Sequence, residues 1–170
     1  MCQTETTQLN DPKTLHTKST MQHLKIKELK NLVGQSLGES THFSITQERI
    51  DGFANTTLDQ QWVHTDPAKA AKYSPFQKTV AHGYLTLSLI PHLMSQVFTI
   101  EDAKMALNYG TDKVRFISPV VVDSEIRLHA SLIRLENIEN GVKLWIEAVV
   151  EVKGGSKPAC SAEIITLVYG

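Results

Sequence analysis

An aspartate and a histidine with four residues between them, Asp59 and His64, are the side chains best suited to acid/base chemistry. A histidine can take a proton from water near neutral pH, and a nearby carboxylate can orient that water or act as the complementary acid or base. The spacing alone is a weak signal, because any two such residues often fall this close. The alternative is an aspartate that caps a helix beside a histidine whose hydrogen bonds are satisfied.

Two large apolar residues, Trp62 and Val63, lie between the members of this pair. They predict that the segment is at least partly buried, which would restrict the pair and limit the access of water. We interpret Trp62 itself as an anchor in the core.

A second candidate, Ala81-His82-Gly83, opens an apolar segment. The first N–H groups of a helix have no partner within it and carry the positive end of its dipole. Because glycine lets a ligand approach closely, the Gly83 N–H is predicted to donate to a carbonyl oxygen that gains enolate character. The alternative is a glycine that only begins a tightly packed helix. His82 is more often a packed histidine than a catalyst, so we predict a supporting role for it.

The segment 80–98 must position these groups. Its leucines alternate with polar residues over 85–89, as in a strand, but its apolar residues also recur at helical spacing. Length favours one buried helix over 80–98, roughly 27 Å long, which Pro91 should kink or end. Upstream we expect a helix over 24–33, ended by Gly34 and Gly38, and then a strand over 43–45. A helix capped by Thr46 and a loop over 55–66 should follow. The last element before this segment is a helix over 67–72, capped by Asp66.

Four strands are expected after this helix, over 104–116, 125–135, 142–152 and 158–168. Asn140-Gly141 and Gly154-Gly155 supply hairpin turns between the later ones. Helices followed by an antiparallel meander predict an α+β domain in which one long apolar helix packs against one curved sheet.

Composition excludes several functional classes. The 170 residues fit one domain, expected over 22–170 after a flexible N-terminal arm over 1–21. The 17 basic and 18 acidic residues leave a net charge of -1, so we expect no nucleic-acid partner. No segment reads as a membrane span or a signal peptide. Because Cys2 and Cys160 have no metal or redox spacing, we expect a cytoplasmic protein with reduced thiols and a core position for Cys160.

Three ordered segments stand out together: Phe53-Ala54, Asp59 to His64 and Ala81 to Ile90, followed by 108–110, 114–116 and 118–120. In this order they resemble the MaoC-like dehydratases, or R-specific enoyl-CoA hydratases, in the branch related to nodulation protein N. The likeness runs from about Gly34 to the C-terminus. It implies the hot-dog fold, an antiparallel β-sheet wrapped around a long central α-helix, and usually a homodimer with acyl tunnels near the interface.

The same resemblance implies roles for individual residues. Asp59 and His64 match the catalytic pair and Gly83 matches the oxyanion-hole amide, while Gln61, where many relatives have asparagine, would hold the loop or the water. The implied substrate is a trans-2-enoyl thioester of CoA or of acyl-carrier protein, hydrated to the 3R-hydroxyacyl thioester or formed from it. No metal and no cofactor beyond the CoA of the substrate is implied. One departure is Leu58, where the family usually has glycine. If the position needs a positive φ, leucine would strain it or shift the loop.

Two other functions remain open at this point. A hot-dog acyl-CoA thioesterase would share the fold and the thioester but release a free thiol. A non-catalytic subunit that binds acyl thioesters or a partner would fit with Leu58 beside Asp59. The intact spacing of Asp59 and His64 favours the hydratase.

Overall fold

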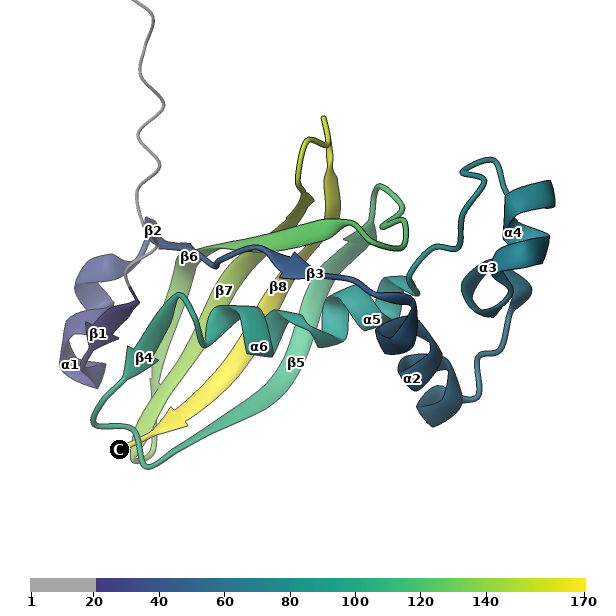
Figure 1. Ribbon diagram of the computed structural model, residues 1–170. Coiled ribbons are helices and arrows are strands. Elements are labelled where there is room, and N and C mark those ends of the chain that lie inside the picture. Colours follow the sequence, from purple (N-terminus) through teal and green to yellow (C-terminus); the bar gives the residue numbers. More distant parts are fainter. Residues whose placement is uncertain (1–20) are drawn as a thin grey trace, which may run out of the picture.

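The computed structural model describes residues 21–170 (Figure 1). The arm expected over 1–21 therefore lies, except for Met21, outside the described residues. The strands are β1 (Gln22–Leu24), β2 (Gln35–Glu39), β3 (Phe43–Ser44), β4 (Phe98–Ile100), β5 (Met105–Phe116), β6 (Glu125–Ile138), β7 (Gly141–Val152) and β8 (Pro158–Tyr169). The helices are α1 (Ile26–Leu29), the 3-10 turn η1 (Lys30–Leu32), α2 (Gln47–Thr57), α3 (Trp62–Thr65), α4 (Pro67–Tyr73), α5 (Gly83–Ser88) and α6 (Ile90–Met94).

The main sheet is antiparallel, with strand order β2-β6-β7-β8-β5, and β3 also pairs with β6. The four long strands expected from the sequence are confirmed, and β6, β7 and β8 form a meander. The tight turn between β6 and β7 places Asn140 at φ 59°, and the next turn places Gly154 at φ 77°, as their residue types allow. β5 is the exception to a simple meander, because it pairs with β8 and not with β6.

The structure corrects the expected helix over 24–33. Only α1 and η1 are helical there, and residues 22–24 form β1, which pairs in parallel with β4. The following strand, β2, was not predicted, because residues 35–39 show no alternation of apolar and polar side chains. Its pairing with β6 is irregular between Ser36 and Gly38, where Gly38 has a φ of 113°. The short strand at 43–45 is confirmed as β3.

The central helix is shorter than expected and interrupted. It begins at Gly83 because Val80 pairs with Val121, and the Ala81 N–H donates to the carbonyl of Val120. The break falls at Leu89, two residues before Pro91, which has no N–H to continue the ladder. Residues 95–98 leave the helix, and Phe98 belongs to β4.

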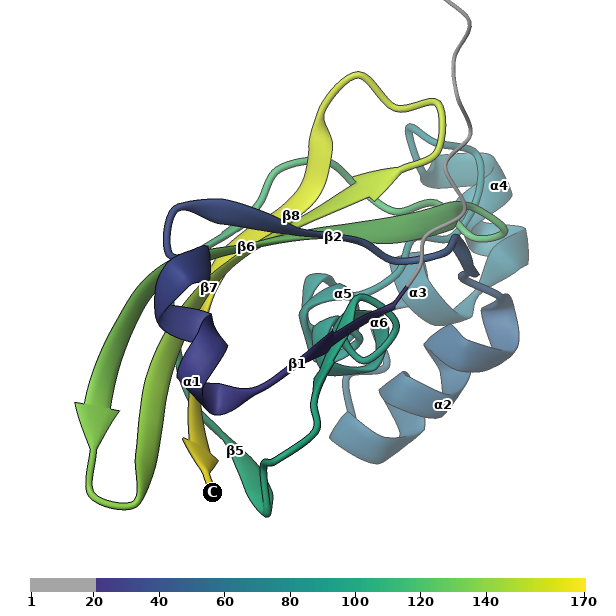
Figure 2. The same cartoon turned by 90° about the vertical axis from the view of Figure 1, so that its left-hand side faces the viewer.

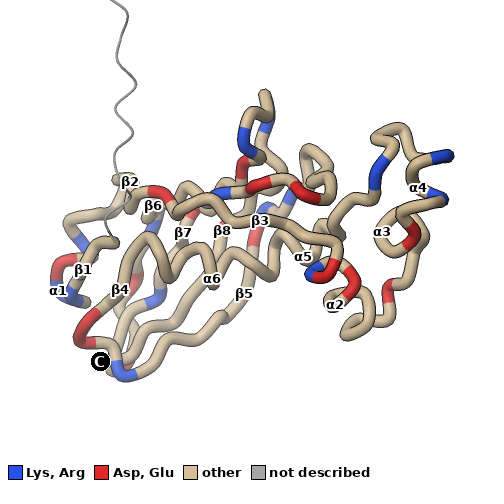
Figure 3. Tube along the Cα trace, in the orientation of Figure 1, with Lys and Arg blue, Asp and Glu red and all other residues tan. Residues whose placement is uncertain are grey.

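The central helix lies inside the curve of the sheet (Figure 2). Leu85, Ile90 and Leu93 are buried on it and join one cluster with the inward side chains of the sheet. The range from Gly83 to Met94 contains no Lys, Arg, Asp or Glu, as the tan trace of α5 and α6 shows in Figure 3. The expected α+β class, with an antiparallel sheet wrapped around a central helix, is confirmed.

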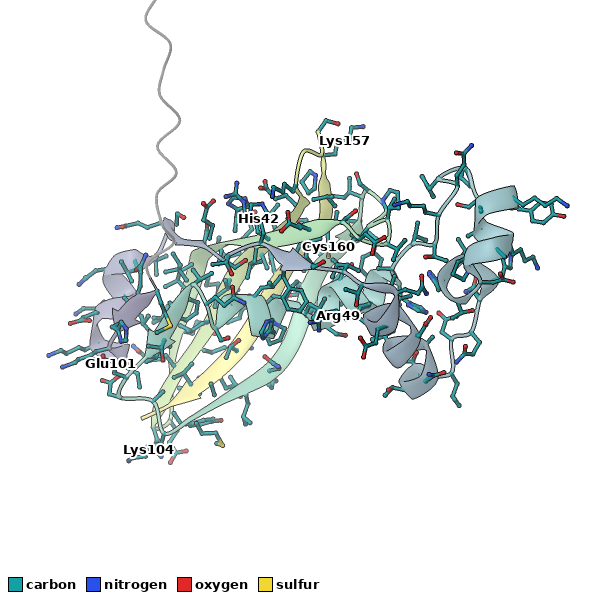
Figure 4. The ribbon with its side chains drawn as sticks, viewed as in Figure 1. His42, Arg49, Glu101, Lys104, Lys157 and Cys160 are labelled. Atoms are coloured by element: carbon teal, nitrogen blue, oxygen red, sulfur yellow. The ribbon has the colours of Figure 1, made fainter. Side chains whose placement is uncertain are left out.

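Two smaller observations complete the fold. Cys160 on β8 is buried, as expected (Figure 4), and burial raises the pKa of its thiol. In the part of the chain that the structure describes, no helix is long and apolar enough to span a bilayer.

Candidate active site

Helices α2, α3 and α4 gather beyond one end of the central helix (Figure 1). The side chain of Thr46 caps α2 by accepting from the Arg49 N–H, and Ile50 and Ala54 are buried on its inner face. Asp66 caps α4 in the same way, accepting from the N–H of Lys69 at 2.9 Å. Both predicted caps are confirmed.

Leu58 ends α2 in the left-handed conformation, with φ 62° and ψ 18°. Asp59 follows directly, and one of its carboxylate oxygens lies within 4.8 Å of a ring nitrogen of His64 and of His82. The Leu58 side chain is 82% exposed and packs little. The position therefore has the positive φ that favours glycine. Leucine adopts this φ here and does not move the backbone to a negative φ.

The expected loop over 55–66 is shorter than predicted, because α2 continues to Thr57 and 62–65 forms α3. A single helical turn is too short to show periodicity in the sequence. Trp62 is 36% exposed, with the Lys69 Nζ 5.2 Å from its ring centre, so its interpretation as a core anchor is wrong. Trp62 begins α3 at the surface, and Val63 and His64, the next two residues of that turn, are partly buried.

Gln47 holds α3 against α2. Its Nε2 donates to the backbone carbonyl of His64 at 2.8 Å, and its Oε1 accepts from the hydroxyl of Thr79 at 2.5 Å. Thr79 is buried. Sequence reasoning missed both residues, because neither stands in a recognisable motif and the contact spans 32 positions along the chain.

His64 is fixed by the segment that leads into α5. Its Nδ1 lies 2.7 Å from the carbonyl oxygen of Val80. A carbonyl can only accept, so Nδ1 carries the proton and Nε2 carries a free lone pair. Burial lowers the pKa of His64, and the nearby His82 lowers it further, while the Val80 hydrogen bond and the Asp59 charge oppose this shift. Near neutral pH the ring is therefore a neutral base at Nε2.

His82 lies directly against His64. The two rings stack with their centres 3.7 Å apart, and Phe53 covers the His82 ring at 5.0 Å. His82 is 3% exposed, and its Nε2 lies 3.0 Å from the backbone carbonyl of Asp59. The Asp59 carboxylate accepts from Gln61 Nε2 at 3.3 Å. The fold thus brings together four residues that the sequence singled out: Asp59, Gln61, His64 and His82.

Gly83 is the first residue of α5, so its N–H has no carbonyl within that helix to bond. The ring of Phe116, at the end of β5, covers it closely. A Cβ added to Gly83 would lie 2.7–2.9 Å from three ring atoms of Phe116. Beside them is a cavity of about 230 Å³ that Thr86 and Val120 also line. Phe116 was quoted only for the family resemblance, and its contact with Gly83 is visible only in the fold.

Comparison with known families supports the resemblance. Residues 28–153 match the model of the MaoC like domain. The 3-hydroxyacyl-thioester dehydratase Z of Mycobacterium tuberculosis is 45% identical over 141 residues, 82% of this chain and 93% of that protein. Nodulation protein N of Rhizobium leguminosarum is 38% identical over 152 residues, 87% of this chain and 93% of that protein.

Solved structures show the same fold. The unliganded R-hydratase PhaJ1 from Pseudomonas aeruginosa superposes with a TM-score of 0.64 at 25% identity, covering 81% of each chain. The (R)-hydratase from A. caviae involved in PHA biosynthesis superposes with a TM-score of 0.63 at 22% identity, covering 75% of this chain and 92% of that one. The curved sheet around a central helix is thus the hot-dog fold that the sequence resemblance implied.

Proposed function

Because this chain belongs to the MaoC-like family, we propose that it is a carbon–oxygen lyase that hydrates trans-2-enoyl thioesters to 3R-hydroxyacyl thioesters, or catalyses the reverse dehydration. One observation carries the proposal: a carboxylate oxygen of Asp59 and a ring nitrogen of His64 lie within 4.8 Å of each other next to the start of α5. The hydrogen bond of Nδ1 to Val80 leaves His64 Nε2 as the nitrogen with a lone pair. Such a pair can move a proton to and from water. The names of the dehydratase and R-hydratase relatives agree with this chemistry.

In the hydration direction, the thioester oxygen accepts a hydrogen bond from the Gly83 N–H, which draws electron density from the β-carbon. His64 Nε2 takes a proton from water as the water oxygen bonds to that carbon. The α-carbon, now part of an enolate, then receives a proton on the same face from the Asp59/His64 pair. The atoms of one water molecule are thus added across the double bond, and the pair returns to its starting state.

The neighbouring residues support this role without taking part in the bond changes. His82 binds the backbone of Asp59 and stacks on His64, so it positions both members of the pair. Gln61 donates to the Asp59 carboxylate and orients it. Phe116 covers Gly83 and limits the space in which a thioester carbonyl can lie.

We also propose that residues 22–170 form a single domain that acts as a cytoplasmic homodimer. On one side β5 pairs with β8, and on its other side it pairs with no strand of the described chain. Met105, Leu107 and Tyr109 on this strand are exposed apolar residues. A second copy would cover such an edge. CoA and acyl-carrier protein are both proposed as carriers of the acyl group.

The test is steady-state hydration of crotonyl-CoA by the wild type and by the Asp59→Asn and His64→Ala variants. Loss of a positioned general acid or base typically costs on the order of 10²- to 10⁴-fold in rate. His92→Ala is the matched control, because His92 is an exposed histidine of α6 outside the site. Wild-type rates in the Asp59 and His64 variants would refute the assignment.

Two further measurements with acyl-CoA separate the alternatives. Release of free thiol from the acyl-CoA would indicate a thioesterase. Binding of acyl-CoA without turnover at any chain length would indicate a non-catalytic subunit. Asp59 and His64, at intact spacing, favour the hydratase over both.

A further inference from the structure

The chain just before α5 holds His64 and its neighbour in α3 through two hydrogen bonds. The His64 Nδ1 donates to the Val80 carbonyl at 2.7 Å, and the Val80 N–H donates back to the carbonyl of Val63 at 3.0 Å. This part of the chain is itself fixed, because the N–H of Val122 donates to the Thr79 carbonyl at 3.0 Å. The imidazole of His64 is therefore placed only as accurately as α3 lies against Thr79 and Val80.

The amide of Gln47, the first residue of α2, also joins α3 to this part of the chain. Its Nε2 donates to the backbone carbonyl of His64 at 2.8 Å and to the Asp51 carboxylate at 2.8 Å. Its Oε1 accepts from the hydroxyl of Thr79 at 2.5 Å, and Thr79 is 1% exposed. Both amide hydrogens and the amide oxygen therefore have partners, and one side chain links the backbone of His64 to Thr79.

These three partners select an amide at position 47. The carbonyl of His64 and the ionised carboxylate of Asp51 can only accept, so the NH₂ group must face them. The Thr79 hydroxyl can donate, so the amide oxygen suits it. Gln47→Glu would keep the shape of the side chain but set an oxygen against the His64 carbonyl. That contact would then have two acceptors and no donor, which is unfavourable away from bulk water.

We propose that Gln47 and Thr79 are positioning residues for His64, an inference that rests on the proposed function. Gln47 holds the backbone of His64, and Thr79 holds Gln47 in its orientation. In the proposed reaction His64 Nε2 must meet a proton of water at hydrogen-bond distance, and a displacement of about 1 Å can cost on the order of 100-fold in rate. The two residues therefore set kcat and leave the binding of the thioester unchanged.

The first test is steady-state hydration of crotonyl-CoA by variants of matched shape. Thr79→Val removes the hydroxyl at nearly constant size, whereas Thr79→Ser keeps the hydroxyl. Gln47→Glu replaces the NH₂ group by an oxygen. Gln35→Ala is the control, because Gln35 is an exposed glutamine of β2 whose amide donates to the nearby carbonyl of Asn31 at 2.9 Å.

We expect Gln47→Glu to lower kcat by about 10- to 100-fold and Thr79→Val by about 10-fold, with KM within about twofold of the wild type. Thr79→Ser and Gln35→Ala should keep the wild-type kcat. The double variant should lose little more than Gln47→Glu alone, because both residues act through the same hydrogen bonds. If Gln47→Glu does not fold, judged by circular dichroism, the two Thr79 variants carry the test. Equal kcat in Thr79→Ser and Thr79→Val, or a change in KM alone, would overturn the inference.

A second readout needs no turnover. The ¹⁵N chemical shifts of the His64 ring report which nitrogen carries the proton, and His64→Ala identifies its signals. We expect the Nδ1–H form in the wild type and a mixture of both forms in Gln47→Glu and Thr79→Val, because the ring is then held less firmly at the Val80 carbonyl. The expected change of shifts in a chain without hydratase activity refutes the proposed function alone. An active hydratase whose variants keep the wild-type kcat and shifts refutes the positioning role alone.

Discussion

Replacement of Leu58 by glycine should stabilise the protein, although it removes a large apolar side chain. Leu58 has φ 62° and ψ 18°, a conformation in which the Cβ of an L-residue crowds the following carbonyl. Its side chain is 82% exposed, so truncation exposes little new apolar surface. The stability effect is therefore dominated by the backbone.

Its magnitude follows from two opposing terms. The left-handed conformation costs an L-residue about 1–2 kcal/mol, and Leu58→Gly removes this cost. Glycine has more freedom to lose on folding, which costs about 0.5–1 kcal/mol. The net expectation is a rise of about 1 kcal/mol in the free energy of unfolding. For a domain of this size, that corresponds to about 2–4 °C in Tm.

Urea denaturation followed by circular dichroism measures this change as a shift in the midpoint at constant slope. Leu58→Ala is the matched control, because alanine also loses the side chain but keeps the cost of the positive φ. We expect Leu58→Ala to lie close to the wild type. If both variants are equally stable, or if glycine is the less stable of the two, leucine is not strained at this position and the reasoning fails.

The site makes two further predictions. Burial and His82 lower the pKa of His64, so the acid limb of kcat/KM should lie at lower pH than for an ordinary histidine, because the unprotonated ring is the active form. His82→Gln should move that limb to higher pH, and a pH–rate profile with no such displacement would contradict the assignment of His64 as the base. Gly83→Ala should lower the free energy of unfolding by about 1–3 kcal/mol, because its Cβ would overlap the Phe116 ring. Adding Phe116→Ala should recover part of that loss in urea denaturation, and no recovery would show that the ring is not the obstacle.

Local features of the fold could be predicted from the sequence. The caps at Thr46 and Asp66 and the turn at Asn140 depend on residues within a few positions of each other. The long strands over 104–168 could also be predicted, because apolar and polar side chains alternate in stretches of each of them. The sequence predicted a break in the central helix at Pro91, and the structure places it at Leu89. The sequence alone does not show which backbone hydrogen bond of the helix is lost.

Long-range pairing could not be predicted in the same way. β5 lies beside β8 and β2 beside β6, and neither sequence contains a signal for its partner. Which strands become neighbours depends on the arrangement that best buries the central helix. That arrangement is a property of the whole chain.

The same distinction between local and long-range features holds for the candidate site. The residue types and the order of the motifs were enough to single out Asp59, His64 and Gly83 as candidates, because both are local properties of the chain. The hydrogen-bond partners of the two histidine rings, in contrast, became visible only in the folded chain. The carbonyl of Val80, 16 positions from His64, accepts from His64 Nδ1. The carbonyl of Asp59, 23 positions from His82, accepts from His82 Nε2. Such contacts depend on the path of the chain around the end of the central helix, which no spacing along the sequence records.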